Sequence, residues 1–134
     1  MSGPEGTSEA ERPRPIVVIV DDDPAVLSAL QRLLRDEPLE VLATSKPEEA
    51  LEWIGARAVG LVVADERMSN MRGLQLLEEV ERRSPATARI LLTGYPEQSV
   101  KHETLAKGVF HLFYKPWNDK VLKRTIRRLV LPEK

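Results

Sequence analysis

Apolar residues occur along the chain in short uncharged runs, each followed by polar turn residues. The most apolar runs cover residues 15–20, 60–65 and 88–94, and they are dominated by valine, isoleucine and leucine. They do not alternate with polar residues, as a strand with one solvated face would, so we expect strands buried on both faces. Shorter runs at 39–44 and 110–114 predict two further strands.

Between these runs, apolar residues recur at the three- and four-residue spacing of amphipathic helices. Asp23 and Asn118 are placed to cap the first and last helices, and Ser45 with Glu48 predicts a capping box for the second. The predicted helices cover residues 24–36, 45–54, 73–83, 97–107 and 119–130.

Strands that alternate with helices through short loops predict a doubly wound α/β domain with a five-stranded parallel sheet. Right-handed crossovers favour the flavodoxin-like (βα)5 winding, with strand order 2-1-3-4-5. A chain of 134 residues fits one such domain, over residues 15–131. Residues 1–14 are rich in Gly, Ser, Glu and Pro and predict a disordered leader, and residues 132–134 form a short tail.

Composition limits the functions that this domain can have. With 20 basic and 21 acidic residues, the net charge of -1 gives no overall attraction to nucleic acid or anionic membranes, so we expect neither as a direct partner. No run approaches the roughly 18 apolar residues of a membrane helix, and we expect a cytoplasmic protein. The absence of cysteine excludes disulfides, thiolate metal sites and thiol nucleophiles.

Chemically capable side chains stand where four of the predicted strands end: Asp21 and Asp22, then Asp65, Thr93 and Lys115. In this winding those ends are neighbours, so the side chains should meet in one crevice. Crowded carboxylates need a covering cation, and ligands that are all oxygen favour Mg²⁺. Asp65 could then attack a phosphoryl group, while the cation and Lys115 neutralise the phosphoryl oxygens and Thr93 donates to them.

These residues resemble the motifs of a response-regulator receiver domain of two-component signalling, over about residues 15 to 130. Each motif alone has low specificity, but four in the expected order at four strand ends form a specific pattern. The matching motifs are Asp21-Asp22-Asp23-Pro24, Asp65 with Met68, Met71 and Gly73, Thr93-Gly94, and Lys115-Pro116, a proline whose peptide bond is typically cis in the family.

The resemblance implies that Asp65 accepts a phosphoryl group from the phosphohistidine of a partner histidine kinase. Thr93 and Lys115 would contact the phosphoryl group and shift the surface of helix 97–107, strand 110–114 and the last helix, to control an unknown output domain or effector. Such a protein is a switch, not an enzyme, apart from Mg²⁺-dependent self-phosphorylation and self-dephosphorylation. The metal ligands implied are Asp22, Asp21 mostly through water, Asp65, and the backbone carbonyl of Arg67.

The sequence departs from the family pattern in the phosphoacceptor loop and in the fifth strand. Ser69 stands where the family usually has proline and Arg72 where it often has aspartate, and we expect both to loosen the loop without affecting the chemistry. Leu112 occupies the position that is commonly an aromatic switch residue, and the adjacent Phe113 and Tyr114 should point elsewhere. An interaction module that signals without phosphorylation is therefore an open alternative.

Two enzymatic or carrier functions fit the sequence less well. A haloacid-dehalogenase-type phosphatase also uses a strand-end aspartate, Mg²⁺, a hydroxyl and a lysine, but it needs an acid two residues after the nucleophile, where this chain has Arg67. A flavin or dinucleotide carrier needs a glycine-rich loop after the first strand, where three aspartates stand. A homodimer through the face that runs from the fourth to the fifth predicted helix is left open.

Overall fold

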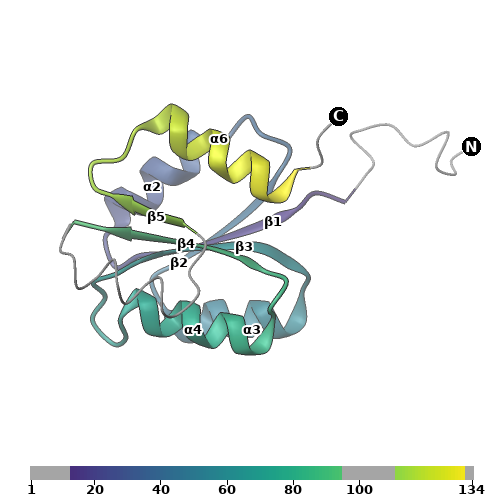
Figure 1. Ribbon diagram of the computed structural model, residues 1–134, viewed down its shortest axis with the longest axis vertical. Coiled ribbons are helices and arrows are strands. Elements are labelled where there is room, and N and C mark those ends of the chain that lie inside the picture. The colour runs from purple at the N-terminus through teal and green to yellow at the C-terminus, as the bar shows by residue number, and fades with distance from the viewer. Residues whose placement is uncertain (1–12, 95–110, 132–134) are drawn as a thin grey trace, which may run out of the picture.

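The computed structural model describes residues 13–94 and 111–131 (Figure 1), and within them the strands form a single parallel sheet. The sheet has five strands in the order β2-β1-β3-β4-β5, which confirms the predicted doubly wound, flavodoxin-like winding. The strands are β1 (Ile16–Val20), β2 (Glu40–Thr44), β3 (Val59–Asp65), β4 (Ala88–Thr93) and β5 (His111–Tyr114).

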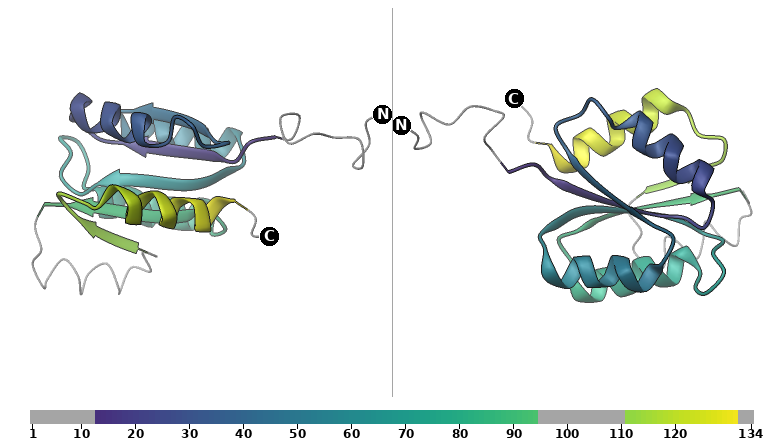
Figure 2. Two further views of the ribbon diagram at one scale, coloured as in Figure 1. Left: turned by 90° about the horizontal axis from the view of Figure 1, so that it is seen from above. Right: turned by 180° about the vertical axis from the view of Figure 1, so that it is seen from behind.

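Helices cover both faces of this sheet. In Figures 1 and 2, α2 and α6 lie on one face and α3 and α4 on the other. The helix predicted over 97–107, most of the leader and the tail at 132–134 lie outside the described residues. No helix within the described ranges is long and apolar enough to cross a membrane. The helices are α2 (Pro24–Leu33), α3 (Pro47–Ala56), α4 (Gly73–Arg83) and α6 (Asp119–Val130).

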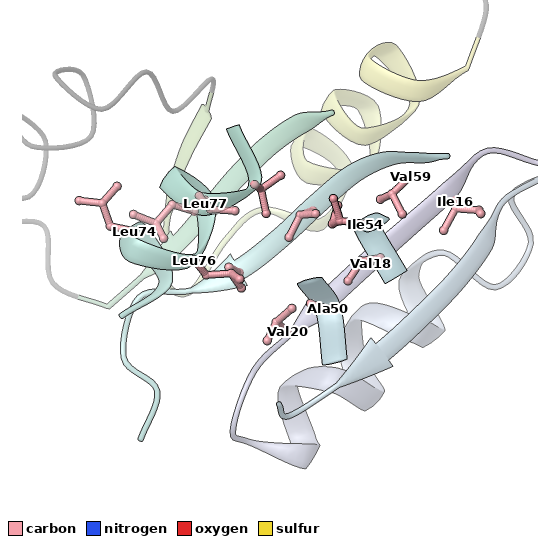
Figure 3. Close-up of a cluster of buried hydrophobic side chains, with 13 residues drawn as sticks. Ile16, Val18, Val20, Ala50, Ile54, Val59, Leu74, Leu76 and Leu77 are labelled. Atoms are coloured by element: carbon pink, nitrogen blue, oxygen red, sulfur yellow. The ribbon is translucent and has the colours of Figure 1, made fainter. Parts of the chain in front are cut away.

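The sheet carries a separate hydrophobic cluster on each face, because alternate residues of one strand point to opposite sides. In β1, Val18 packs with side chains of α3 and α4, in the cluster that Figure 3 shows. Val17 packs on the opposite face, with side chains of α2 and α6. Burying one such side chain contributes roughly 1.5–3 kcal/mol. Both faces of the sheet are thus covered by helices.

Two of the three predicted helix caps are confirmed. The Asp23 carboxylate accepts a hydrogen bond from the Ala25 N–H at 2.9 Å, with Pro24 in the first turn of α2. The Asn118 side chain accepts from the Val121 N–H at 3.0 Å at the start of α6. Both side chains satisfy amide groups that have no partner within the helix.

The predicted cap of α3 was wrong. Its N-cap residue is Lys46, which makes no side-chain cap hydrogen bond. The Thr44 hydroxyl, at the end of β2, instead accepts from the Lys46 N–H at 3.0 Å and donates to Glu49. The strand end therefore supplies the hydroxyl that the sequence pattern assigned to Ser45, which is exposed.

Candidate functional site

Parallel pairing places four of the predicted site residues along one edge of the sheet. The pairing register runs from β1 through β3 and β4 to β5 without a break at this edge. Thr93 is buried, and its carbonyl accepts a hydrogen bond from the Lys115 N–H at 2.8 Å. The four residues lie at or directly after their strand ends: Asp21 (β1), Asp65 (β3), Thr93 (β4) and Lys115 (β5).

A lysine ammonium joins the two buried carboxylates of this edge. The Lys115 Nζ lies 2.6 Å from Asp65 Oδ1 and 3.7 Å from Asp21 Oδ2. The other oxygen of Asp65, Oδ2, accepts a hydrogen bond from the backbone N–H of Arg67 at 3.0 Å. Because both carboxylates are almost fully buried, their charges interact strongly with the ammonium.

The electrostatics of this cluster depend on burial first and on charge second. Burial raises the pKa of Asp21 from 3.8 to about 6, and the charge of Asp65 adds to the rise, although the Asp23 N–H and Lys115 oppose it. Burial lowers the pKa of Lys115, but its hydrogen bond with Asp65 and the charges of both aspartates outweigh burial and leave that pKa above its ordinary value. Lys115 is therefore protonated, and ionisation of Asp21 costs free energy.

Asp22 does not join this cluster in the structure. Its side chain is exposed, and its Oδ2 accepts two hydrogen bonds from Ser69, one from the backbone N–H and one from the hydroxyl, both at 2.6 Å. Across residues 13–94 and 111–131, no three acidic or histidine side chains are grouped so that they could hold a metal ion. The predicted ligand set is thus only partly assembled.

The donors that are assembled fit a hard divalent cation. In the part of the chain that the structure describes, the buried Asp21 Oδ2 is left without a hydrogen-bond partner. A buried carboxylate oxygen in that state is costly, and a cation would satisfy it. Asp21 and Asp65 supply only oxygen, the donor type that Mg²⁺ prefers. Asp22 would complete the set if its carboxylate left Ser69, and the role of the Arg67 carbonyl stays a prediction.

Glu66, which directly follows Asp65, was missed from the sequence. Its buried carboxylate accepts hydrogen bonds from the Leu74 N–H at 3.0 Å and from Arg72 Nε at 2.6 Å, and its carbonyl accepts from the Gly73 N–H at 3.0 Å. Glu66 therefore satisfies amides at the start of α4 and pairs with Arg72. No sequence spacing rule links it to these partners, because the loop alone sets the geometry.

The expectation that Ser69 and Arg72 loosen the loop was wrong for both residues. Ser69 attaches the loop to Asp22 with two hydrogen bonds, and Arg72 attaches it to the buried Glu66. Serine and arginine supply hydrogen-bond donors at these positions that proline and aspartate lack. The loop that follows Asp65 is consequently attached to Asp22 at its middle and closed by the contact between Arg72 and Glu66.

Gly73 allows the loop to return close to the phosphoacceptor candidate. A Cβ atom at this position would lie 2.1 Å from the Asp65 carbonyl oxygen and 2.9 Å from Leu91 Cδ1. Real Cβ atoms do not approach backbone so closely, so a side chain here would displace the backbone of Asp65. Gly73 thus keeps Asp65 in place by steric necessity.

The fifth strand agrees with two expectations. The Lys115–Pro116 peptide bond is cis, as the family resemblance implied. Leu112 is half-buried and packs with the cluster under α3 and α4, whereas Phe113 packs with the opposite cluster and Tyr114 is exposed. Phe113 therefore points away from the side that Leu112 occupies, as predicted, whereas Tyr114, two residues after Leu112, lies on the same side of the strand and is exposed.

A buried strand-end carboxylate, salt-bridged to a lysine at a nearby strand end of a doubly wound sheet, is the arrangement that the sequence resemblance implied. The family model described as the response regulator receiver domain matches residues 17–127. The chain belongs to this family.

Similar proteins support the assignment. The chain is 32% identical to the hydrogenase transcriptional regulatory protein HoxA of Cupriavidus necator, over 85% of this chain and 24% of that protein. It is 30% identical to the response regulator protein TmoT of Ectopseudomonas mendocina, over 84% of this chain and 51% of that protein. The chain thus spans about a quarter to a half of the length of these relatives.

Solved structures agree in fold. The signal receiver domain of an HD domain-containing protein from Pseudomonas fluorescens superposes with a TM-score of 0.82 at 30% identity, covering 87% of this chain and 94% of that one. The chemotaxis protein CheY4 of Vibrio cholerae superposes with a TM-score of 0.79 at 25% identity, covering 87% of this chain and 99% of that one.

Proposed function

We propose that this receiver domain is a phosphorylation switch in which Asp65 accepts a phosphoryl group from a histidine kinase. The observation that carries the proposal is the buried Asp65 carboxylate with the Lys115 ammonium 2.6 Å from its Oδ1. A carboxylate with a fixed cation beside it is prepared for a reaction that brings more negative charge to the same place. The proposal places the domain in the cytoplasm, as the sequence predicts.

In the proposed reaction, the second ring nitrogen of the phosphohistidine carries a proton taken from solvent. An Asp65 oxygen attacks the phosphorus, the P–N bond breaks with its electron pair going to the ring nitrogen, and neutral imidazole leaves. Lys115 stays protonated and moves its charge from the carboxylate to the phosphoryl oxygens. Thr93, buried at the adjacent strand end, would donate to the same oxygens. A bound Mg²⁺, held by Asp21, Asp22, Asp65 and the Arg67 carbonyl, would supply further positive charge for the phosphoryl group.

Phosphorylation would act on a partner through the surface around β5, because Lys115 connects the site to that strand. Its N–H is hydrogen-bonded to Thr93 of β4 and its ammonium to Asp65 of β3, so a change in the phosphoryl state at Asp65 would reach the edge strand β5 through this residue. Relatives such as HoxA are named transcriptional regulatory proteins, which supports an output domain or effector as the target. A shift between two states of this surface is the switch that we propose.

Labelling with a small acyl phosphate and Mg²⁺ tests the phosphoacceptor. We expect the intact mass to rise by one phosphoryl group, and hydroxylamine to remove it, because an acyl phosphate is labile to this nucleophile. Asp65→Asn should not be labelled, because an amide oxygen is a poor nucleophile. The control Asp36→Asn, an exposed acid just after α2, should be labelled as wild type is.

The same experiment separates the alternatives. A wild-type protein that gains no mass, with the fold intact by circular dichroism, would favour an interaction module that works without phosphorylation. Equal labelling of Asp65→Asn and wild type would refute Asp65 as the acceptor. Repeated release of phosphate from a phosphate monoester would favour a phosphatase, a result that we do not expect because Arg67 cannot act as the general acid.

A further inference from the structure

Asp22 and Ser69 link the first strand end to the loop after Asp65. Both hydrogen bonds end on the same atom, Asp22 Oδ2, at 2.6 Å from the Ser69 N–H nitrogen and 2.6 Å from the Ser69 hydroxyl. Both residues are exposed. The carboxylate that the ligand set lacks is therefore held by two donors of one loop residue.

We infer that Ser69 is a positioning residue that holds Asp22 away from the cation site and so sets the Mg²⁺ concentration at which the site fills. The inference rests on the proposed function, because it assumes that Asp22 is a ligand. Without three grouped acids among the described residues, Asp22 has to turn before it completes the set. Turning costs the two hydrogen bonds, and this cost lowers the affinity for the ion.

The strength of these bonds follows from charge. Hydrogen bonds to an ionised carboxylate are stronger than those between neutral groups, although water competes for the exposed Asp22. Serine supplies a backbone donor and a hydroxyl donor at this position. Alanine would keep only the backbone donor, and proline would keep neither. Ser69 variants thus form a graded series in which the number of donors falls from two to zero.

Isothermal titration of the unphosphorylated protein with MgCl2 at pH 8 tests this series. We expect the Mg²⁺ dissociation constant to fall about threefold in Ser69→Ala and about tenfold in Ser69→Pro. The control Asn70→Ala alters the next exposed loop residue and should leave the constant unchanged. Stability measured with a chelator should differ little between wild type and Ser69→Ala, which separates a change in metal affinity from damage to the fold.

NMR gives a second readout that does not depend on affinity. The Ser69 amide proton should resonate downfield in the metal-free wild type, and Asp22→Asn should move it upfield, because the acceptor loses its charge. Added Mg²⁺ should move the wild-type resonance in the same direction as Asp22 turns to the ion. This readout tests the inference even if Ser69→Pro does not fold.

Three results would overturn the inference. One is an equal or larger Mg²⁺ dissociation constant in both Ser69→Ala and Ser69→Pro, which would leave the phosphorylation of Asp65 untouched. Another is a Ser69 amide that does not respond to Asp22→Asn. The third is the absence of Mg²⁺ binding in wild type and every variant, which would also remove the metal from the proposed function.

Discussion

A single buried carboxylate, Asp21, dominates the electrostatics of the site. Only 2% of its surface is exposed, and its Oδ2 lacks a hydrogen-bond partner among the described residues. The pKa of Asp21 is therefore raised to about 6, chiefly by burial. An acid with a raised pKa keeps its proton to a higher pH in the native protein than in the unfolded chain, so its ionisation destabilises the fold.

Asp21 should make the metal-free protein less stable as pH rises from about 4 to 6. Between these pH values Asp21 is ionised in the unfolded chain but still protonated in the native protein. Above this window the ionised Asp21 lowers the free energy of unfolding by its full amount, about 2 to 3 kcal/mol from the shift in pKa. Asp21→Asn should therefore raise the free energy of unfolding at pH 7.5 by about 2 kcal/mol, and the gain should vanish near pH 4. Urea denaturation with a chelator measures both values.

Asp36→Asn serves as the control for this change, because Asp36 is exposed and lies at the far end of α2 from the site. It should alter the free energy of unfolding by little at either pH. If the gain of Asp21→Asn over wild type were no larger at pH 7.5 than at pH 4, burial of the Asp21 charge would not be the dominant cost.

The residues that the sequence identified are those whose position follows from the sheet. Asp21, Asp65, Thr93 and Lys115 could be grouped because parallel strands end at one edge. The hydrogen bonds of Asp22 with Ser69 could not be predicted from the sequence. They join residues 47 positions apart through two loops whose backbone conformation no sequence pattern encodes.

At the scale of elements, the loop between β3 and α4 fixes the geometry around Asp65. Its start is held by Glu66, whose N–H donates to the Leu92 carbonyl at 2.8 Å, and its end by Gly73, which returns against the Asp65 carbonyl. The five strands and the four helices that the structure describes were predicted well because each buries a regular apolar pattern. The loop was predicted poorly because its order comes from polar contacts.

Two glycine substitutions separate steric need from helix propensity. Gly73→Ala should destabilise the protein by about 2 kcal/mol or more, because its Cβ would meet backbone atoms of Asp65. Gly55→Ala, within α3, meets nothing within 4 Å and should stabilise it by about 0.5–1 kcal/mol. Thermal unfolding of both variants measures these changes.

The same two variants also test the reactivity of Asp65. Gly73→Ala should also slow labelling of Asp65 by an acyl phosphate, since the shifted backbone moves the carboxylate from Lys115. Gly55→Ala should label at the wild-type rate. A Gly73→Ala protein as stable and as reactive as wild type would show that the loop does not need this close approach.

At the scale of the whole molecule, the site belongs to the folded sheet and to no single segment. Asp21, Asp65 and Lys115 come from strands that are separated in sequence and meet only when β1, β3, β4 and β5 are aligned. Any ion that binds them therefore binds the native state and not the unfolded chain. Ligand binding of this kind stabilises the fold by mass action.

Mg²⁺ should accordingly raise the thermal midpoint of unfolding. At a concentration about 100 times its dissociation constant, the ion should add about 2.7 kcal/mol to the free energy of unfolding. Asp22→Ala should abolish the gain, because the ligand set then lacks one carboxylate. Differential scanning calorimetry with and without the ion measures the effect, and an unchanged wild-type midpoint would count against the metal site.

Lys115 is fastened twice, by its main chain to Thr93 and by its ammonium to Asp65. The two attachments use different atoms of the residue, so the long side chain can exchange one anion for another while the main-chain hydrogen bond to Thr93 is kept. The side chain of Lys115 thereby recognises charge, and its main chain maintains the sheet. In an engineered receiver, charge recognition could be changed through the length of this side chain, for example with Lys115→Arg, while the main-chain hydrogen bond is kept.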